Sequence, residues 1–226
     1  MHGGQPWEDR AHSWIDWVRA ERRSGFTSQT WPALEAILPS HVAGRVLDLG
    51  CGEGRSAREL TWSSYDVVGV ESSSTLATAA RFHEVPTRVL LGDATSLPFA
   101  DSCFSLVVAC MSLQDIVDLP TALSEVGRVL EAGGSLCLSI RHPSFTAIGG
   151  SWERERPRRQ VQEYLKERTY EEHMSNGPQE MRFESFHRPL AAYVGAITAA
   201  GLAVTCLNEI GDGVLPQLLV ARAIKL

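Results

Sequence analysis

The sequence contains no apolar run close to the roughly 20 residues that a membrane-spanning helix needs. Residues 1–7 also lack the basic segment and the apolar segment that together mark a secretory signal. We therefore expect a chain that is neither inserted in a membrane nor exported.

Basic residues are fewer than acidic ones, with 21 Lys and Arg against 27 Asp and Glu and a net charge of -6. Proteins that bind DNA or RNA usually show a basic footprint, because they neutralise phosphates. The charge balance therefore disfavours a nucleic-acid partner, although it leaves room for a local basic patch.

Cysteine is scarce: the chain has five, an odd number, and neither a C-x-x-C nor an H-x-x-H spacing. Those spacings are typical of zinc ligands, so we expect no metal site of that kind, while a carboxylate-bound magnesium ion stays an open alternative. At least three of the cysteines lie in apolar runs, where a free thiol behaves as a small hydrophobe. Most should be buried structural thiols, which fits a reducing cytoplasm.

Short apolar runs alternate with helix-length stretches from Arg45 onwards. This order is typical of an α/β domain with a mostly parallel sheet and helices on both faces. A length of 226 residues suits one such domain, so we treat residues 1–226 as a single unit. Strands are expected at residues 46–49, 67–70, 88–91, 104–109, 135–140, 202–207 and 215–223, and helices at 56–62, 75–83, 121–130 and 189–200.

Two segments lie outside this alternation. Residues 1–40 predict a helical cap in which Trp7, Trp14 and Trp17 recur at near-helical spacing. Such a stripe usually packs on the edge of a core, and the alternative is a lid over a ligand pocket. Residues 142–186 are rich in charge and poor in apolar side chains, and a connection of this length is either a solvated surface or a functional lid.

A glycine-rich turn follows the first expected strand. Glycines stand at positions 50, 52 and 54 after Asp48, and a helix is expected to start directly behind them. Glycine lets the backbone approach a ligand closely, and a helix N-terminus presents free N–H groups. The dinucleotide fingerprint G-x-G-x-x-G needs a third glycine where this chain has Arg55, so the match to that class is poor.

The order D-x-G-x-G-x-G after a buried strand resembles motif I of the class I S-adenosylmethionine (SAM)-dependent methyltransferases, in particular their type 11, UbiE-like small-molecule group. The resemblance extends over about residues 44–140. It includes Glu71 and Asp93 at the ends of the second and third strands, the run L-P-F-A-D-S-C-F-S-L-V-V from Leu97, and R-V-L-E-A-G-G from Arg128. The run from Leu97 departs from the family pattern at Ser105, where an Asp is usual.

This resemblance implies a Rossmann-like sheet of seven strands, mostly parallel with the last strand antiparallel, with the N-terminal helices and a lid inserted after strand five. It implies SAM as the cofactor, with an acidic residue on the ribose hydroxyls and an Asp near the adenine amino group. The cofactor-binding residues it implies are Asp48, Gly50, Cys51, Gly52, Glu71, Ser72, Asp93, Ala94, Cys110 and Met111.

The acceptor is expected beyond the carboxyl ends of strands four and five. The segment 110–115 after strand four is not the N-P-P-Y tetrad of enzymes that methylate nucleic-acid bases or glutamine side chains. His142 follows strand five as a candidate base or acceptor-binding group, and Gln114 and His187 are further acceptor-binding candidates, although either histidine could instead be structural.

The sequence therefore predicts in-line methyl transfer to a nitrogen or oxygen of a small molecule, possibly a secondary metabolite, with positioning as the main contribution of the protein. Two alternatives remain from the residues: a NAD(P)-dependent oxidoreductase on a Rossmann sheet, and a SAM-binding module without catalysis. The oligomeric state cannot be read from the sequence.

Overall fold

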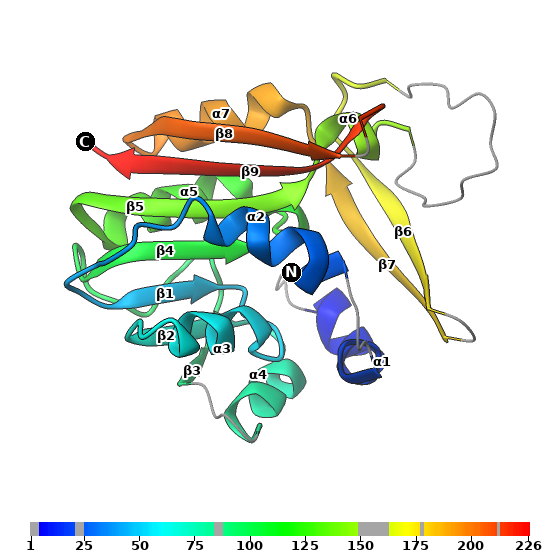
Figure 1. Cartoon of the computed structure of the whole chain (residues 1–226), viewed down its shortest axis with the longest axis horizontal. Helices are drawn as coiled ribbons and strands as arrows, with labels where there is room; N and C mark the ends of the chain where they lie inside the picture. Colours follow the sequence, from blue (N-terminus) through cyan, green and yellow to red (C-terminus); the bar gives the residue numbers. More distant parts are fainter. Residues whose placement is uncertain (1–4, 21–24, 84–87, 149–162, 177–178, 212) are drawn as a thin grey trace.

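A seven-stranded sheet runs through the molecule in the order β3-β2-β1-β4-β5-β9-β8 (Figure 1). The structure is a computed structural model that describes residues 5–20, 25–83, 88–148, 163–176, 179–211 and 213–226. The strands of this sheet are β1 (Val46–Leu49), β2 (Val67–Glu71), β3 (Val89–Leu91), β4 (Phe104–Cys110), β5 (Leu130–Arg141), β8 (Leu202–Gly211) and β9 (Pro216–Lys225).

The sheet is parallel from β3 to β5, and β9 pairs antiparallel with both β5 and β8. The chain enters β1 in the middle of the sheet and moves outward to β3 before it crosses back to β4. This crossover makes the carboxyl ends of β1 and β4 a switch point, where open α/β sheets bind ligands. The fold class expected from the sequence, including the antiparallel last strand, is confirmed.

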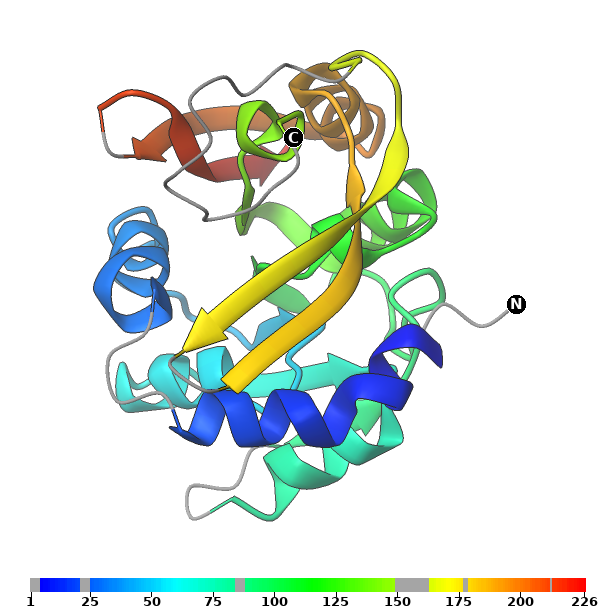
Figure 2. The same cartoon turned by 90° about the vertical axis from the view of Figure 1, so that its right-hand side faces the viewer.

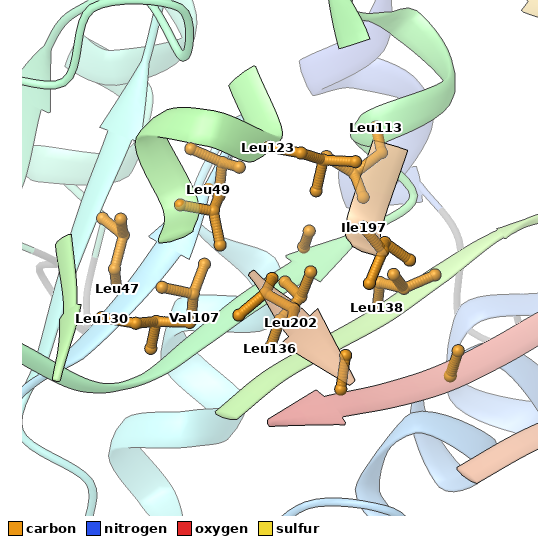
Figure 3. Packing of buried hydrophobic residues seen from close by; sticks show 14 of the residues in the cluster. Leu47, Leu49, Val107, Leu113, Leu123, Leu130, Leu136, Leu138, Ile197 and Leu202 are labelled. Atoms are coloured by element: carbon orange, nitrogen blue, oxygen red, sulfur yellow. The ribbon is translucent and has the colours of Figure 1, made fainter. Parts of the chain in front are cut away.

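Side chains alternate between the two faces of the sheet because successive residues of a strand point to opposite sides. Leu47 and Leu49 point into the core cluster that α5 (Leu119–Val129) and α7 (Leu190–Ala199) cover, and Val46 points into the cluster on the other face. Figure 3 shows the first of these clusters, with leucines from the strands meeting leucines and an isoleucine from the helices. Each central strand is apolar on both faces for this reason, which is why it reads as a continuous hydrophobic run.

The opposite face is covered by α2 (Trp31–Glu35) and α3 (Arg55–Trp62), which bury Trp31, Leu34 and Leu60. A π-helical turn, η1 (Phe26–Thr30), precedes α2. None of the helices in the described ranges is both long and apolar enough to cross a bilayer.

The N-terminal helix α1 (Gln5–Ala20) lies across the carboxyl ends of the central strands (Figure 2). It packs on α4 (Ser74–Arg81) and on the later strand β7 (Gln179–His187). Glu8 fixes it there: its Oε2 accepts from Ser73 Oγ at 2.5 Å, and its Oε1 accepts from Thr75 Oγ1 at 2.6 Å. A carboxylate at the start of α4 also meets the positive end of that helix.

The segment after β5 folds into a short helix, α6 (Pro143–Thr146), and an antiparallel hairpin of β6 (Arg168–Asn176) and β7 (Gln179–His187). Figure 2 shows this hairpin crossing in front of the sheet, with its lower end beside α1. Residues 149–162, which hold the charged run of the expected lid, lie outside the described residues. No helix or strand was expected from the sequence between residues 142 and 186, whereas the part from Arg168 onwards is a regular two-stranded antiparallel ribbon.

Replacing Glu8 with Gln should loosen α1 without unfolding the sheet. The hydroxyl hydrogen bonds from Ser73 and Thr75 hold the pKa of Glu8 at about 2, so the charged form is the bound one. Amide hydrogen exchange should therefore accelerate in α1 and at the start of α4 but not in β4 or β5.

The same loosening is expected in the wild type as the pH falls from about 4.5 towards 2, because the stabilisation by a carboxylate with a lowered pKa is lost over that range. Uniform exchange rates in the variant and the wild type would contradict this role of Glu8.

Candidate active site

The turn between β1 and α3 is a left-handed backbone that only glycine adopts without strain. Gly50, Gly52 and Gly54 have φ of +68°, +56° and +89°. Other L-residues pay for this conformation through a clash of Cβ with the following carbonyl. A Cβ on Gly50 would also meet Ser112 Cβ at 2.6 Å, whereas one on Gly52 would meet nothing closer than Trp14 Nε1 at 3.9 Å. The turn is therefore closely packed against Ser112 at Gly50, whereas a Cβ at Gly52 would make only an ordinary van der Waals contact with Trp14 of α1.

Glu71 ties this turn to the end of β2. Its Oε2 accepts from Gly52 N at 2.8 Å, and its Oε1 accepts from Ser73 N at 2.8 Å. The backbone adds two bonds, because Gly50 N and Cys51 N both donate to the carbonyl of Val70. Burial raises the pKa of Glu71, and the amide hydrogen bonds oppose that rise.

Asp48 lies beneath the turn and is fully buried. Its Oδ2 accepts from Ser56 Oγ at 2.7 Å, and its Oδ1 has no hydrogen-bond partner among the described residues. Desolvation raises its pKa to about 7. A buried acceptor without a donor is costly, and such atoms point to a missing ligand, water or proton.

A cavity of about 1450 Å³ opens at the carboxyl ends of the strands. Pockets for a single drug-sized ligand measure about 300–1,000 Å³, so this one has room for two molecules side by side. Ten of the residues predicted to bind cofactor or acceptor line it: Gly50, Cys51, Gly52, Glu71, Ser72, Asp93, Ala94, Cys110, Met111 and Gln114. The structure thus brings together side chains from four strand ends, as the sequence pattern predicts.

Asp93 sits in a tight turn after β3, where its Oδ1 accepts from both the amide and the hydroxyl of Thr95 at 2.8 Å. This turn fixes the carboxyl at the edge of the cavity.

The chain leaves β4 through Met111, a non-glycine residue with φ +57°. Strain of this kind costs on the order of 1 kcal/mol and gathers at functional sites. It turns the backbone into the 3-10 turn η2 (Leu113–Asp115), whose Gln114 and Asp115 line the cavity. Gln114 Oε1 accepts from the amide of Arg141 at 2.7 Å, which joins η2 to the end of β5.

The two free cysteines that line the cavity, Cys51 and Cys110, are protonated thiols and therefore poor nucleophiles. Cys51 is buried and Cys110 is half-buried. Burial raises the pKa of Cys110 to about 12 and that of Cys51 well above its usual range. Of the other thiols, Cys137 is buried as expected, while Cys103 and Cys206 are only half-buried.

His142 and His187 lie outside the cavity lining. His142 caps α6, because its Nδ1 accepts from Ser144 N at 3.0 Å, and its Nε2 bonds Glu209 at 2.8 Å. His187 is fully buried and bonds Thr146 Oγ1 at 2.6 Å and the carbonyl of Tyr164 at 2.9 Å. Both ring nitrogens of each histidine are engaged, so the structure gives these two candidates structural surroundings in place of the expected acceptor contacts.

Several lining residues were not singled out from the sequence as ligand-binding groups. Asp115 accepts from Ser185 Oγ at 2.5 Å, and desolvation raises its pKa to about 8. Arg141 Nε donates to Glu172 Oε1 at 2.7 Å, in a pair that is almost fully buried. Asp115 ends the segment after strand four that marks the acceptor side, but nothing local distinguishes it, because its partner lies 70 residues away.

The N-terminal tryptophans both pack in an apolar cluster and cover the ligand pocket, which are the two roles that the sequence left open. Trp7, Trp14 and Trp17 line the cavity, and they also form a satellite cluster with Met181 and Phe183 of the hairpin. The tryptophans therefore pack, as expected, but they pack against the β6–β7 hairpin, and in doing so they form part of the cavity wall.

Comparison with known proteins gives a match of residues 47–138 to the family model of a methyltransferase domain. A malonyl-[acyl-carrier protein] O-methyltransferase of Pectobacterium atrosepticum is 31% identical over 122 residues, which are 54% of this chain and 48% of that protein. A demethylmenaquinone methyltransferase of Renibacterium salmoninarum is 33% identical over 120 residues, 52% of this chain and 51% of that protein. The chain thus spans about half the length of the curated relatives it matches.

Among solved structures, an S-adenosylmethionine-dependent methyltransferase of Mesorhizobium loti superposes with a TM-score of 0.69. The alignment covers 86% of this chain and 97% of that one, at 22% identity. A likeness at this identity concerns the fold.

Gly50→Ala should destabilise the protein more than Gly52→Ala. Both substitutions place a Cβ at positive φ, at about 1–2 kcal/mol, but only the first also drives it into Ser112. Urea unfolding should show a clearly larger loss for Gly50→Ala, and equal losses would mean that the contact with Ser112 relaxes freely.

Stability should fall as the pH rises from about 4 to about 8. The folded protein binds the protons of Asp48 and Asp115 more tightly than the unfolded chain, with pKa values of about 7 and 8 against about 4. Their contribution is complete below pH 4 and is lost as the pH passes through 7 and 8.

Asp115→Asn removes one of these groups, so the variant should gain on the wild type in urea unfolding as the pH increases through 8. Glu131→Gln is the matched control, because Glu131 is exposed at the other end of β5. A difference between Asp115→Asn and wild type that does not change with pH would contradict the assignment.

Proposed function

From the match of residues 47–138 to the methyltransferase-domain family, we propose that this chain is a SAM-dependent methyltransferase that transfers a methyl group to a nitrogen or oxygen of a small molecule. The observation that carries the proposal is the glycine turn: Gly50, Gly52 and Gly54 are all left-handed, and Glu71 is bonded to its central amide. The proposal places the reaction in the cytoplasm.

The polar groups that line the cavity are of the kind that would bind SAM. An acidic residue at the end of β2, an acidic residue after β3 and a glycine turn, all in the cavity lining, match the polar edges of a nucleoside linked to an amino acid. In the assignment that the family resemblance implies, Glu71 takes the ribose hydroxyls and Asp93 the adenine amino group. The turn 50–54, with the orphaned Oδ1 of Asp48 beneath it, takes the methionine portion.

When bound, SAM supplies a methyl group on a sulfonium, which is a good leaving group. The protein then contributes mainly by holding the acceptor in line and keeping water out, and alignment of this kind supplies about 7–11 kcal/mol in favourable cases. Helix α1 and the β6–β7 hairpin cover the cavity with apolar side chains, among them Trp17, Met174 and Phe183. These elements suit the exclusion of water.

The two alternatives are less well supported. A pyrophosphate would need close helix approach at the position of Arg55, whose guanidinium instead stacks on Phe26 with 4.1 Å to the ring centroid. A SAM-binding module without catalysis would not need the additional space, lined by Asp115 and Glu172, that the cavity holds beyond the glycine turn.

The relatives methylate chemically different acceptors, as their names state: a malonyl group on acyl-carrier protein in one case and demethylmenaquinone in the other. We therefore take a small-molecule acceptor as the class. An acidic chain with net charge -6 makes a nucleic-acid acceptor unfavourable.

Titration calorimetry should give micromolar binding of S-adenosylhomocysteine and no binding of NAD. Glu71→Gln should weaken S-adenosylhomocysteine by about 1–3 kcal/mol, because a charged acceptor is lost. Glu131→Gln, which removes the same charge far from the cavity, should leave the affinity unchanged. Binding of NAD in preference to S-adenosylhomocysteine would overturn the proposed function.

A further inference from the structure

The inner face of the β6–β7 hairpin forms one wall of the cavity, with Glu172, Met174 and Phe183 in the lining. Directly opposed residues of an antiparallel pair share a face, and Glu172 is opposed to Phe183 as Tyr170 is to Ser185. These four side chains are buried, while Glu171 and Glu184 on the other face are exposed. The hairpin therefore presents an apolar ring, a hydroxyl and a carboxyl on one surface.

Three aromatic rings meet at this wall. Trp7 lies 5.4 Å from Trp14 and 5.3 Å from Phe183, and Trp14 lies 6.2 Å from Phe183, measured between ring centroids. All three line the cavity. Such a cluster attracts flat apolar bodies and, through the negative ring faces, cations.

Asp115 stands next to this cluster along β7. It bonds Ser185, which is two residues from Phe183 on the same face of the strand, a spacing of about 7 Å. Among the residues that the structure describes, Asp115 forms no ion pair, whereas the neighbouring Glu172 is paired with Arg141. A carboxyl and an aromatic cluster thus lie one small molecule apart.

The groups around Asp115 leave its charge without a bonded cation. Arg188 donates instead to the carbonyls of Ile116 and Val117, at 2.7 and 2.9 Å. The titratable and charged groups that face Asp115 are Tyr170 and Glu172 from β6, Arg141 from β5, Arg188 before α7 and Tyr193 in α7.

The excess of acidic side chains in the cavity lining also favours a cationic ligand. Its lining includes seven carboxyl groups against two guanidinium groups: Glu53, Glu71, Asp93, Asp115, Asp118, Glu172 and Glu180, against Arg55 and Arg141. Three of these carboxyl groups are paired with a guanidinium: Glu53 with Arg58 behind the wall, Glu172 with Arg141 and Glu180 with Arg182. An acidic cavity concentrates cationic ligands and repels carboxylates.

We propose that the methyl acceptor is a small amine on an aromatic or apolar body, with its nitrogen at the Asp115 carboxyl and its body against Trp7, Trp14 and Phe183. This inference rests on the proposed function and specifies its acceptor. It also makes Asp115 the group that receives the proton of the amine.

The proton that the acceptor must lose before methyl transfer stays within this site, on Asp115. A bound ammonium gives one proton to the Asp115 carboxylate and becomes a neutral amine with a lone pair. That lone pair forms the new C–N bond while the C–S bond breaks and its electrons stay on sulfur, so the product is a methylated ammonium. Burial raises the pKa of Asp115 to about 8, which brings it closer to that of an amine and makes the transfer easier than to an ordinary carboxylate.

Matched ligands test the acceptor class. With S-adenosylhomocysteine bound, 2-phenylethylamine, 2-phenylethanol and 3-phenylpropanoate are titrated into the wild type, Asp115→Asn and the control Glu131→Gln between pH 6 and 9. The amine should bind about tenfold more tightly than the alcohol at pH 8, a difference of about 1.4 kcal/mol. Its affinity should rise from pH 6 to 8, while the alcohol stays flat and the carboxylate binds most weakly.

Asp115→Asn should abolish both the preference for the amine and its pH dependence, and Glu131→Gln should keep both. Phe183→Leu should weaken the amine and the alcohol by similar factors. At pH 7 the wild type should also release close to one proton per amine bound, read from titrations in two buffers of different ionisation enthalpy. This readout needs only the wild type and decides the question if Asp115→Asn does not fold.

Equal binding of amine and alcohol, or no binding of any of the three ligands, overturns the amine acceptor. Tight binding of the carboxylate does the same. Failure of S-adenosylhomocysteine to bind is a separate result, because it removes the proposed function itself.

Discussion

The hydrogen bond between the Glu71 carboxylate and the Gly52 amide holds the ends of β1 and β2 in one rigid turn. It works only because Gly50 and Gly52 are left-handed, which turns the Gly52 amide towards Glu71. The remaining parts of the cavity are arranged around this point: Asp48 lies below it, Trp14 lies opposite it, and Glu8 fixes α1 over it through the start of α4. A local backbone constraint thereby sets where a ligand can lie.

The sheet could be predicted from the sequence because its central strands are buried on both faces. Runs such as residues 104–109 have no polar face to confuse the pattern, and the expected strands agree with the observed ones to within a few residues, apart from β5, which begins at Leu130. The resemblance to methyltransferases is confirmed over residues 47–138 and in the fold. The β6–β7 hairpin was missed because its charged outer face hides the apolar inner one. Its signal was present in the alternation of apolar and charged residues from Met181 to Phe183.

The two halves of the cavity differ in how far the sequence specifies them. The cofactor half consists of strand ends with short motifs, so its residues follow from local order. The acceptor half is assembled from α1, η2 and the hairpin, and the contact of Asp115 with Ser185 or of Glu8 with Ser73 joins segments more than 60 residues apart. The two histidines were chosen by their position after β5 and β7, but the packing of α6 and β8 gave both rings other partners.

The cysteines beside the glycine turn and at the end of β4 lie where a bound alkylating cofactor could modify them. A thiolate is among the best nucleophiles in a protein, and Cys51 and Cys110 line the space in which we place an alkylating cofactor. Burial keeps both sulfurs protonated at any physiological pH, since the pKa of Cys110 is about 12 and that of Cys51 is raised well above its usual range. Desolvation thus makes these sulfurs poor nucleophiles, so that an alkylating cofactor held in this space would not modify the wall of its own cavity.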